Sequence, residues 1–116
     1  MKMENINGIA VVRGEGLILI DTQTALGLIA DASYHADSSK IILFKENVAE
    51  DFFKLSTGLL GEVLQKFVTY GVKLAIVGDF SKYTSKPLHD FIYESNKGGH
   101  IYFVTDEQSA IKKLRE

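Results

Sequence analysis

The sequence predicts a single α/β domain with a mainly parallel central sheet of about five strands, an antiparallel first strand and a covering of about four helices. The first observation behind this prediction is the almost wholly apolar run at residues 72–77, which is typical of a strand covered on both faces. Residues 40–44 form a second run of the same kind. Amphipathic helical patterns alternate with these runs, as they do in parallel β–α–β units.

The composition is that of one globular domain spanning residues 1–116, with 46% hydrophobic and 24% charged residues. The net charge is −2, and the 13 basic and 15 acidic residues are interleaved, whereas nucleic-acid binding usually needs a basic excess on one face. The absence of cysteine excludes disulfides, zinc–thiolate sites and thiol catalysis. No apolar run approaches the roughly 20 residues that span a bilayer. We therefore expect a cytoplasmic protein that binds neither nucleic acid nor membrane.

The chain is expected to begin with an antiparallel hairpin. Residues 8–12 are a β-branched run, and residues 17–20 return as a second strand. Residues 13–16 contain two glycines, which can take the positive φ that a tight turn needs. Asp21 then caps a helix, because its carboxylate can accept hydrogen bonds from first-turn N–H groups. The apolar stripe of this helix consists of Ala25, Leu28, Ile29, Ala32 and Ala36.

Residues 45–54 are predicted to form a loop or short helical turn with Phe52 and Phe53 folded beneath it. Ser56 or Thr57 is expected to cap the helix that follows. The buried face of this helix consists of Leu59, Leu60, Val63, Leu64, Phe67 and Val68.

Three glycines mark this second helix. Gly71 is expected to end it. Gly58 and Gly61 each cost about 1 kcal/mol relative to alanine inside a helix. This cost suggests that another backbone, or a ligand, comes close to the start of the helix.

The second half of the chain continues the alternation. Residues 78–84 form a polar loop, and Ser85 is expected to cap a helix that carries Pro87 in its first turn. The inner face of this helix consists of Leu88, Phe91, Ile92 and Ser95. Residues 101–104 are predicted as the last strand. Thr105 is expected to open a capping box that starts the final helix.

The resulting order of elements, ββαβαβαβα, resembles that of the STAS domain, the fold of bacterial anti-anti-sigma factors and of sulfate-transporter tails. The likeness in residues lies at Leu55-Ser56-Thr57-Gly58-Leu59, where that family carries an Asp-Ser-Ser/Thr-Gly-Leu signature. In anti-anti-sigma factors the first serine is phosphorylated by a partner anti-sigma kinase, so the resemblance implies that Ser56 is a phosphorylation site. Leu55 stands where the family has aspartate.

Three further segments look like a small bacterial family known as domain of unknown function 4180. They are residues 61–67, 73–81 and 90–96. The likeness is strong over the second half of the chain and follows the pattern of elements in the first half. It implies no particular activity.

Ligands of an open α/β sheet bind beyond the carboxyl ends of its strands. The polar residues that the sequence places at these ends, and that we expect to converge with Ser56 and Thr57, are Asp21, Glu46, Asn47, Asp79, Ser81, Lys82, Thr105 and Asp106. We call residues 45–59 and 78–86 the carboxyl-end rim. A simpler interpretation is that these residues cap helices and line solvated loops, because caps favour the same residue types.

Several residues of the rim are candidates for contact with a partner or ligand: Glu46, Asn47, Phe53, Ser56, Thr57, Gly58, Asp79, Phe80, Ser81, Lys82 and Tyr83. A phosphate on Ser56 would be stabilised at a helix N-terminus, although a plain helix cap explains the same serine. Residues 81–86 offer two cations, hydroxyls and an aromatic ring to a phosphate or a base, or form a solvated connection.

No metal site or cofactor is predicted, because His35, His89 and His100 share no metal-ligand spacing and are expected at the surface. Asp79 directly follows a buried strand, and this position could raise its pKa.

The interpretation that we favour is a non-enzymatic regulatory module that binds a protein partner through the carboxyl-end rim. Such a module should expose an apolar patch around Phe52, Phe53 or Phe80. The second hypothesis is a module for a small ligand, a nucleotide or another phosphate compound, at the same rim, which requires a concave pocket. The third is a hydrolytic enzyme that acts through Asp79 and Ser81.

Overall fold

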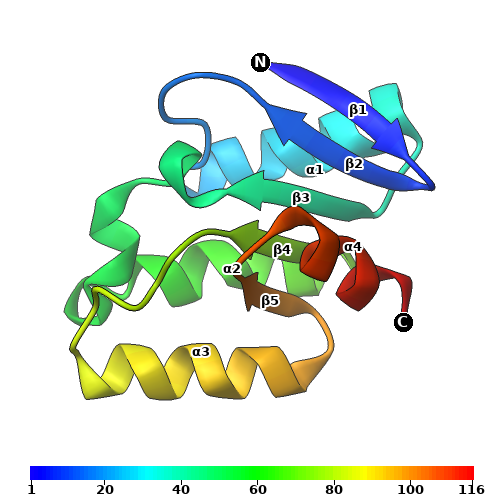
Figure 1. Ribbon diagram of the computed structural model, residues 1–116. Helices are drawn as coiled ribbons and strands as arrows, with labels where there is room; N and C mark the ends of the chain where they lie inside the picture. Colours follow the sequence, from blue (N-terminus) through cyan, green and yellow to red (C-terminus); the bar gives the residue numbers. More distant parts are fainter.

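The computed structural model describes all of residues 1–116 and contains one five-stranded sheet in the order β1–β2–β3–β4–β5 (Figure 1). The strands are β1 (Lys2–Ile6), β2 (Ile9–Arg13), β3 (Lys40–Phe44), β4 (Lys73–Val77) and β5 (Ile101–Val104). β1 runs antiparallel to β2, and every other neighbouring pair is parallel. The predicted mainly parallel sheet with an antiparallel first strand is confirmed.

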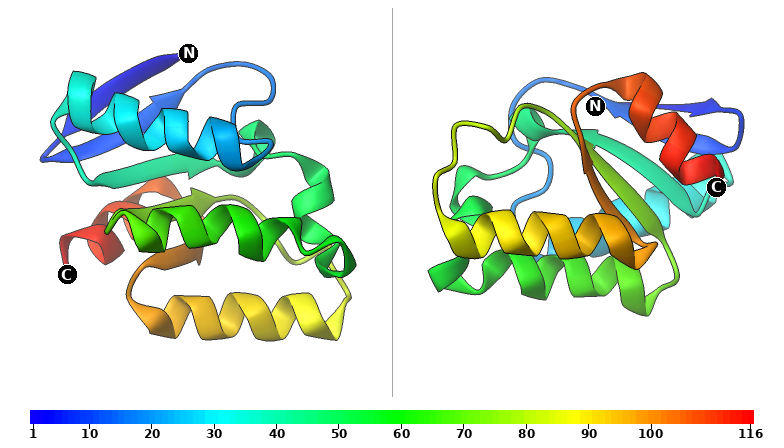
Figure 2. Two further views of the ribbon diagram at one scale, coloured as in Figure 1. Left: turned by 180° about the vertical axis from the view of Figure 1, so that it is seen from behind. Right: turned by 60° about the horizontal axis from the view of Figure 1, so that its bottom comes forward.

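Helices cover both faces of this sheet. They are α1 (Thr22–Ala36), α2 (Leu59–Thr69), α3 (Lys86–Gly98) and α4 (Glu107–Arg115). The first three lie on one face and α4 lies on the other (Figure 2). Leu74 and Ile76 of β4 join the larger core under α1–α3, and Ala75 and Val77 join the smaller core under α4. This alternation explains why β4 has no polar face. It lies between β3 and β5, so β3 is the middle strand.

The hairpin exists, but other residues form it. β1 and β2 are joined by Asn7 and Gly8, which both have positive φ, 54° and 86°. Asn-Gly is the preferred pair for such a tight hairpin turn. Residues 17–20, predicted as the second strand, form no strand, and only Leu19 makes an isolated bridge, to Val48. That prediction is wrong because the turn signal at Asn7-Gly8 precedes the first apolar run instead of following it.

The helix caps follow the sequence at α1 and α3. The Asp21 carboxylate accepts a hydrogen bond from the Thr24 N–H at 2.8 Å, and the Thr24 hydroxyl accepts one from the Asp21 N–H at 3.1 Å. Ser85 caps α3 through its hydroxyl oxygen. At α4 the cap is Asp106 and not Thr105. A carboxylate is a stronger acceptor than a hydroxyl, so the helix begins one residue later than predicted.

The three glycines in and around α2 differ in backbone conformation and in the space around them. Gly71 follows the end of α2 with a φ of 69°, as expected of a helix-ending glycine. Gly58 precedes α2 with a φ of 72°. A Cβ placed on Gly58 or Gly61 would have no protein atom within 4 Å, so the predicted close approach of another backbone is wrong, and the approach of a ligand stays a prediction.

The edge strand β5 is partly covered by the side chain of Asn96 in α3. The Asn96 Oδ1 accepts a hydrogen bond from the Phe103 N–H at 2.7 Å, and its Nδ2 donates to the Phe103 carbonyl oxygen at 3.2 Å. The amide group thereby replaces the pair of bonds that a neighbouring strand would make. Since open strand edges promote aggregation, this contact both fixes α3 against β5 and protects the edge.

We expect Asn96→Ala to lower the free energy of unfolding by about 1–3 kcal/mol, because it leaves two backbone groups of Phe103 without partners. The open edge should also increase self-association. Urea titration measures the first effect, and light scattering after size exclusion measures the second. Lys97→Ala, at the exposed next position, is the control. Unchanged stability and unchanged apparent mass in Asn96→Ala would contradict the role of the amide.

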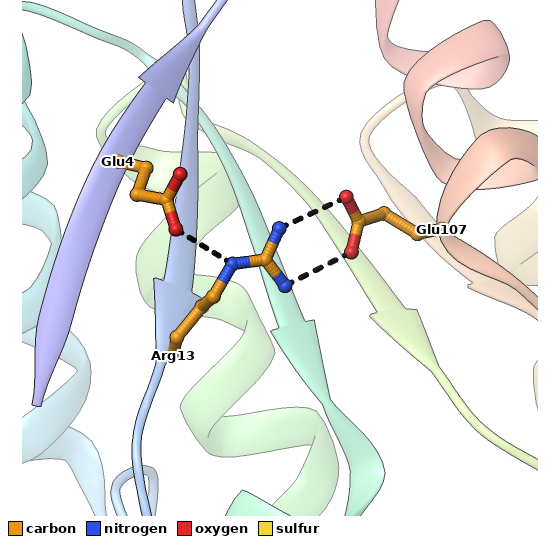
Figure 3. A network of polar contacts seen from close by, with 3 residues as sticks. All are labelled: Glu4, Arg13 and Glu107. Carbon is orange, nitrogen blue, oxygen red and sulfur yellow. Dashed lines mark hydrogen bonds and ion pairs between the residues drawn. The ribbon is translucent and has the colours of Figure 1, made fainter.

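Arg13, the last residue of β2, connects β1 to α4 (Figure 3). Its Nε donates to Glu4 at 2.8 Å, and its two terminal nitrogens donate to the two carboxylate oxygens of Glu107 at 3.1 Å each. The bonds to Glu107, and then those to Glu4, raise the pKa of the Arg13 guanidinium. The forked contact holds the first turn of α4 over the smaller core.

Arg13→Lys is expected to lower the free energy of unfolding by up to about 1 kcal/mol. Lysine keeps the charge but cannot form the forked pair with Glu107, and the site is partly exposed. The loss should shrink in high salt, which screens partly exposed charges. A double-mutant cycle with Glu107→Gln measures the coupling, and fully additive effects would contradict it.

Candidate functional site

The two segments of the carboxyl-end rim lie side by side beyond the strand ends (Figures 1 and 2). In the parallel pair β3–β4, Phe44 lies opposite Val77, so Lys45 and Gly78 leave the sheet next to each other. The first segment continues as three short 3₁₀ turns. They are η1 (Lys45–Asn47), η2 (Glu50–Phe53) and η3 (Leu55–Thr57).

Aromatic rings join the two segments of the rim. The ring of Phe53 stacks on that of Tyr83 with centroids 5.1 Å apart, and lies 5.7 Å from that of Phe80. Phe80 meets Phe103 of β5 edge to face at 5.3 Å. Phe52 and Phe53 are buried beneath the 3₁₀ turns, as the sequence predicts, and Phe80 is half-buried. The expected exposed apolar patch around these phenylalanines is therefore absent.

A charged cluster of Lys45, Glu50, Lys82 and Tyr83 lies beside these rings. The Tyr83 hydroxyl donates to Glu50 at 2.6 Å. The ammonium nitrogens of Lys45 and Lys82 lie 3.5 Å and 4.0 Å from the Glu50 carboxylate oxygens. They also lie 5.1 Å and 5.2 Å from the centre of the Tyr83 ring, within cation–π range. The bond from Tyr83 lowers the pKa of Glu50, while burial and this same bond raise the pKa of Tyr83.

The side chain of Lys45 can pack against residue 78 only because that residue is glycine. A Cβ on Gly78 would lie 2.5 Å from the Lys45 Cβ and 3.0 Å from its Cδ. The Lys45 side chain is only 16% exposed, and its ammonium group lies 5.4 Å from the centre of the Phe53 ring. A glycine at this strand end therefore allows a lysine to cross it and reach Glu50.

A shallow depression of about 460 Å³ lies beside the charged cluster. The residues that line it are Phe44, Lys45, Glu46, Val77, Gly78, Asp79 and Lys82. A second depression of about 390 Å³ lies between α2 and α3 and contains no residue of the rim.

Asn47 is buried, with 1% of its surface exposed, and its side chain is used by the fold. The Nδ2 group donates to the carbonyl oxygens of Gly14 and Gly16 at 3.0 Å and 2.8 Å. The Asn47 carbonyl oxygen accepts from the N–H groups of Ile18 and Leu19 at 2.7 Å and 3.0 Å. A side chain that is buried and bonded in this way is not available to a partner, so the prediction that Asn47 contacts one does not agree with its burial.

The loop of residues 14–20, which these bonds hold, adjoins the rim and is absent from the sequence-based site. The Ala49 N–H donates to the Leu19 carbonyl oxygen at 3.0 Å and secures the loop further. Leu17 and Ile20 remain 63% and 41% exposed. These two side chains add exposed apolar surface next to the polar residues of the rim. No local signal separates this apolar run from a strand, because the bonds that shape it come from residues 47 and 49.

Asp79 forms a local turn with Ser81. Its Oδ1 accepts a hydrogen bond from the Ser81 N–H at 2.9 Å, and its contacts with Ser81 lower the pKa of the Asp79 carboxyl. This is opposite to the rise that the sequence suggests, because Asp79 lies at the surface. The His89 ring contacts the carbonyl oxygen of Tyr83 and makes no hydrogen bond with Asp79. A carboxylate with a lowered pKa is a weak proton acceptor.

Ser56 and Thr57 do not cap α2 as predicted, because the N-cap is Gly58. The Thr57 hydroxyl accepts from the first N–H of the helix at 3.1 Å. The Ser56 side chain is exposed and makes no hydrogen bond. The N–H groups of Leu60 and Gly61, in the first turn of α2, have no acceptor.

The remaining polar residues at the strand ends, Asp21, Thr105 and Asp106, lie at the N-termini of α1 and α4. Asp21 and Asp106 are helix caps, and the Thr105 hydroxyl contacts the Asp106 carboxylate at 3.3 Å. These three residues make no contact with the charged cluster. No group of three or more His, Asp or Glu side chains is arranged to hold a metal ion. None of the four helices has the length and apolar character to cross a bilayer.

A crystal structure of a protein from Thermotoga maritima, assigned as an anti-sigma factor antagonist, has a similar fold. The two structures superpose with a TM-score of 0.52 over 99% of this chain and 94% of the other, at 12% sequence identity. The likeness is therefore one of fold, and the fold is STAS-like, as the sequence predicts. No curated protein matches the sequence. The family model described as domain of unknown function (DUF4180) matches residues 4–114, and the chain belongs to that family.

Proposed function

We propose that this protein is a regulatory module that binds a protein partner through the carboxyl-end rim and the adjoining loop of residues 14–20. The observation that carries the proposal is the ordered charged cluster at the rim, next to a loop that exposes Leu17 and Ile20. Protein interfaces combine an apolar centre with a polar periphery, so a partner can use both the exposed loop and the charged cluster. The STAS-like fold, shared with an anti-sigma factor antagonist, supports a regulatory role.

The test uses two matched substitutions of exposed serines. Ser81→Arg places a bulky charge on the rim, beyond the carboxyl ends of the strands. Ser39→Arg places the same charge just before β3, at the amino ends of the strands. We expect the parent and Ser39→Arg to retain the same protein from a lysate of the native host, and Ser81→Arg to lose it. Equal retention by both variants would contradict binding at the rim.

The proposal includes phosphorylation of Ser56 as the regulatory step. Its hydroxyl is exposed and unbonded, and the unpaired N–H groups of Leu60 and Gly61 at the start of α2 would stabilise an added phosphoryl group. We expect Ser56→Asp to weaken retention of the partner and Ser56→Ala to preserve it. Unchanged retention by Ser56→Asp would remove this step from the proposal.

The two lysines that line the depression, Lys45 and Lys82, favour one alternative, a small phosphate ligand such as a nucleotide. The depression is shallow, and others of about 420 Å³ lie elsewhere on the surface, so the two lysines and not the volume support this alternative. A nucleotide titration followed by NMR should then shift the signals of Tyr83 and its neighbours. Absence of such shifts would exclude this alternative. The lowered pKa of Asp79 gives no support to hydrolytic chemistry.

A further inference from the structure

Glu50 is the only acid that pairs with both lysines of the charged cluster. Lys45 and Lys82 come from the two different segments of the rim, and both ammonium groups face the same carboxylate. The Tyr83 hydroxyl, a third donor, points to it as well. Two cations and one O–H group thus converge on a position that a carboxylate occupies.

Two of the three donors, Lys45 and Tyr83, are held in place independently of Glu50, whereas the Lys82 side chain is 62% exposed and contacts only Glu50 and the Tyr83 ring. Lys45 is fixed by its passage over Gly78 and by the rings of Phe53 and Tyr83. Tyr83 is fixed by stacking on Phe53. The Lys45 side chain as a whole is 16% exposed, and a cation that is partly removed from water is stabilised by a negative charge beside it. The site would therefore remain ready for an anion if Glu50 moved away.

Glu50 itself is held loosely by the lysines. Its distances to their nitrogens, 3.5 Å and 4.0 Å, exceed those of a good charge-assisted hydrogen bond. Its side chain is 59% exposed and lies in a short 3₁₀ turn. Exposed ion pairs of this kind contribute little stability. The one short contact that an incoming carboxylate must replace is the 2.6 Å hydrogen bond from the Tyr83 hydroxyl.

We propose that Glu50 occupies, in the free protein, an anion site formed by Lys45, Lys82 and the Tyr83 hydroxyl, and that an acidic segment of the protein partner replaces it there. The inference rests on the proposed function and adds the chemistry of the partner. Glu50 thus acts as an internal competitor that the partner displaces.

The surrounding charges favour a carboxylate from a protein over a free phosphate dianion. Glu46 and Asp79 line the shallow depression beside the charged cluster, together with Lys45 and Lys82. These two acids repel added negative charge. An incoming carboxylate adds one negative charge near these two acids, whereas a phosphate dianion adds two and is repelled more strongly.

The test measures binding of a blocked hexaglutamate peptide at low salt, followed by the NMR signals of the Gly78 and Tyr83 amides. Glu50→Gln removes the competing charge but keeps an acceptor for the Tyr83 hydroxyl. We expect it to bind the peptide about tenfold more tightly than the parent, and Lys82→Gln about tenfold more weakly. Lys112→Gln, an exposed lysine on α4, should match the parent. Equal or weaker binding by Glu50→Gln would overturn the inference.

A second arm replaces the peptide with inorganic phosphate at the same ionic strength. If phosphate responds to Glu50→Gln as strongly as the peptide does, the site serves free anions and the assignment to a protein segment fails. The proposed function is tested separately by Ser81→Arg and Ser39→Arg. Loss of the partner in Ser81→Arg together with no effect of Glu50→Gln would retain the rim as an interface and reject the anion exchange.

Discussion

Gly78→Ala is expected to lower the free energy of unfolding by about 1–3 kcal/mol, the usual cost of forcing a carbon atom into a packed site. The added Cβ would lie 2.5 Å from the Cβ of Lys45. That atom is attached to the backbone, so it cannot swing away as the end of a flexible side chain can. Either β3 and β4 separate at their ends, or Lys45 loses its contacts with Glu50 and Tyr83. Urea unfolding followed by circular dichroism measures the loss.

Gly61→Ala is the matched control for this prediction. Gly61 lies in α2, and a Cβ there would have no atom within 4 Å. Because alanine restricts the unfolded chain and favours helix, we expect this variant to gain about 0.5–1 kcal/mol. If both variants lost stability equally, the glycine at residue 78 would not be explained by its contact with Lys45.

The fold could be predicted from the sequence wherever a local pattern determines an element. β4 is recognisable because both of its faces are apolar, and Asp21 and Ser85 are recognisable because a cap acts on its own helix. Residues 17–20 could not be assigned in this way. Their conformation depends on bonds to Asn47 and Ala49, about 30 residues further along the chain, and an apolar run of four residues carries no sign of them.

The location of the site could be predicted from the sequence, but the contacts between its side chains could not. Parallel strands bring their carboxyl ends to one edge, so the meeting of residues 45–59 with 78–86 follows from the order of elements. The charged cluster depends on the register that sets Lys45 beside Gly78, and Glu50 is therefore missing from the predicted contacts. Asn47 is predicted among the contacts because its residue type is polar, but residue type does not reveal that its side chain points inward.

Asn47→Asp is expected to be more destabilising than Asn47→Ala. The alanine variant removes both donors to Gly14 and Gly16 and should cost about 1–3 kcal/mol. The aspartate variant also removes them and directs a buried negative charge at two carbonyl oxygens, which adds a further cost of similar size. Urea unfolding at neutral pH measures both values, and hydrogen exchange at Ile18 and Leu19 reports whether the 14–20 loop is released.

The pH dependence separates these two effects. The folded state disfavours the ionised carboxylate at residue 47, so the introduced group has a higher pKa folded than unfolded. Its destabilisation is therefore smallest below about pH 4, the unfolded value for aspartate, and grows as the pH rises through the folded value. Below that range the protonated carboxyl can still donate one hydrogen bond to Gly14 or Gly16. Asn47→Ala should show no such trend relative to the parent, and a pH-independent difference between the two variants would mean that residue 47 is not facing these carbonyl oxygens.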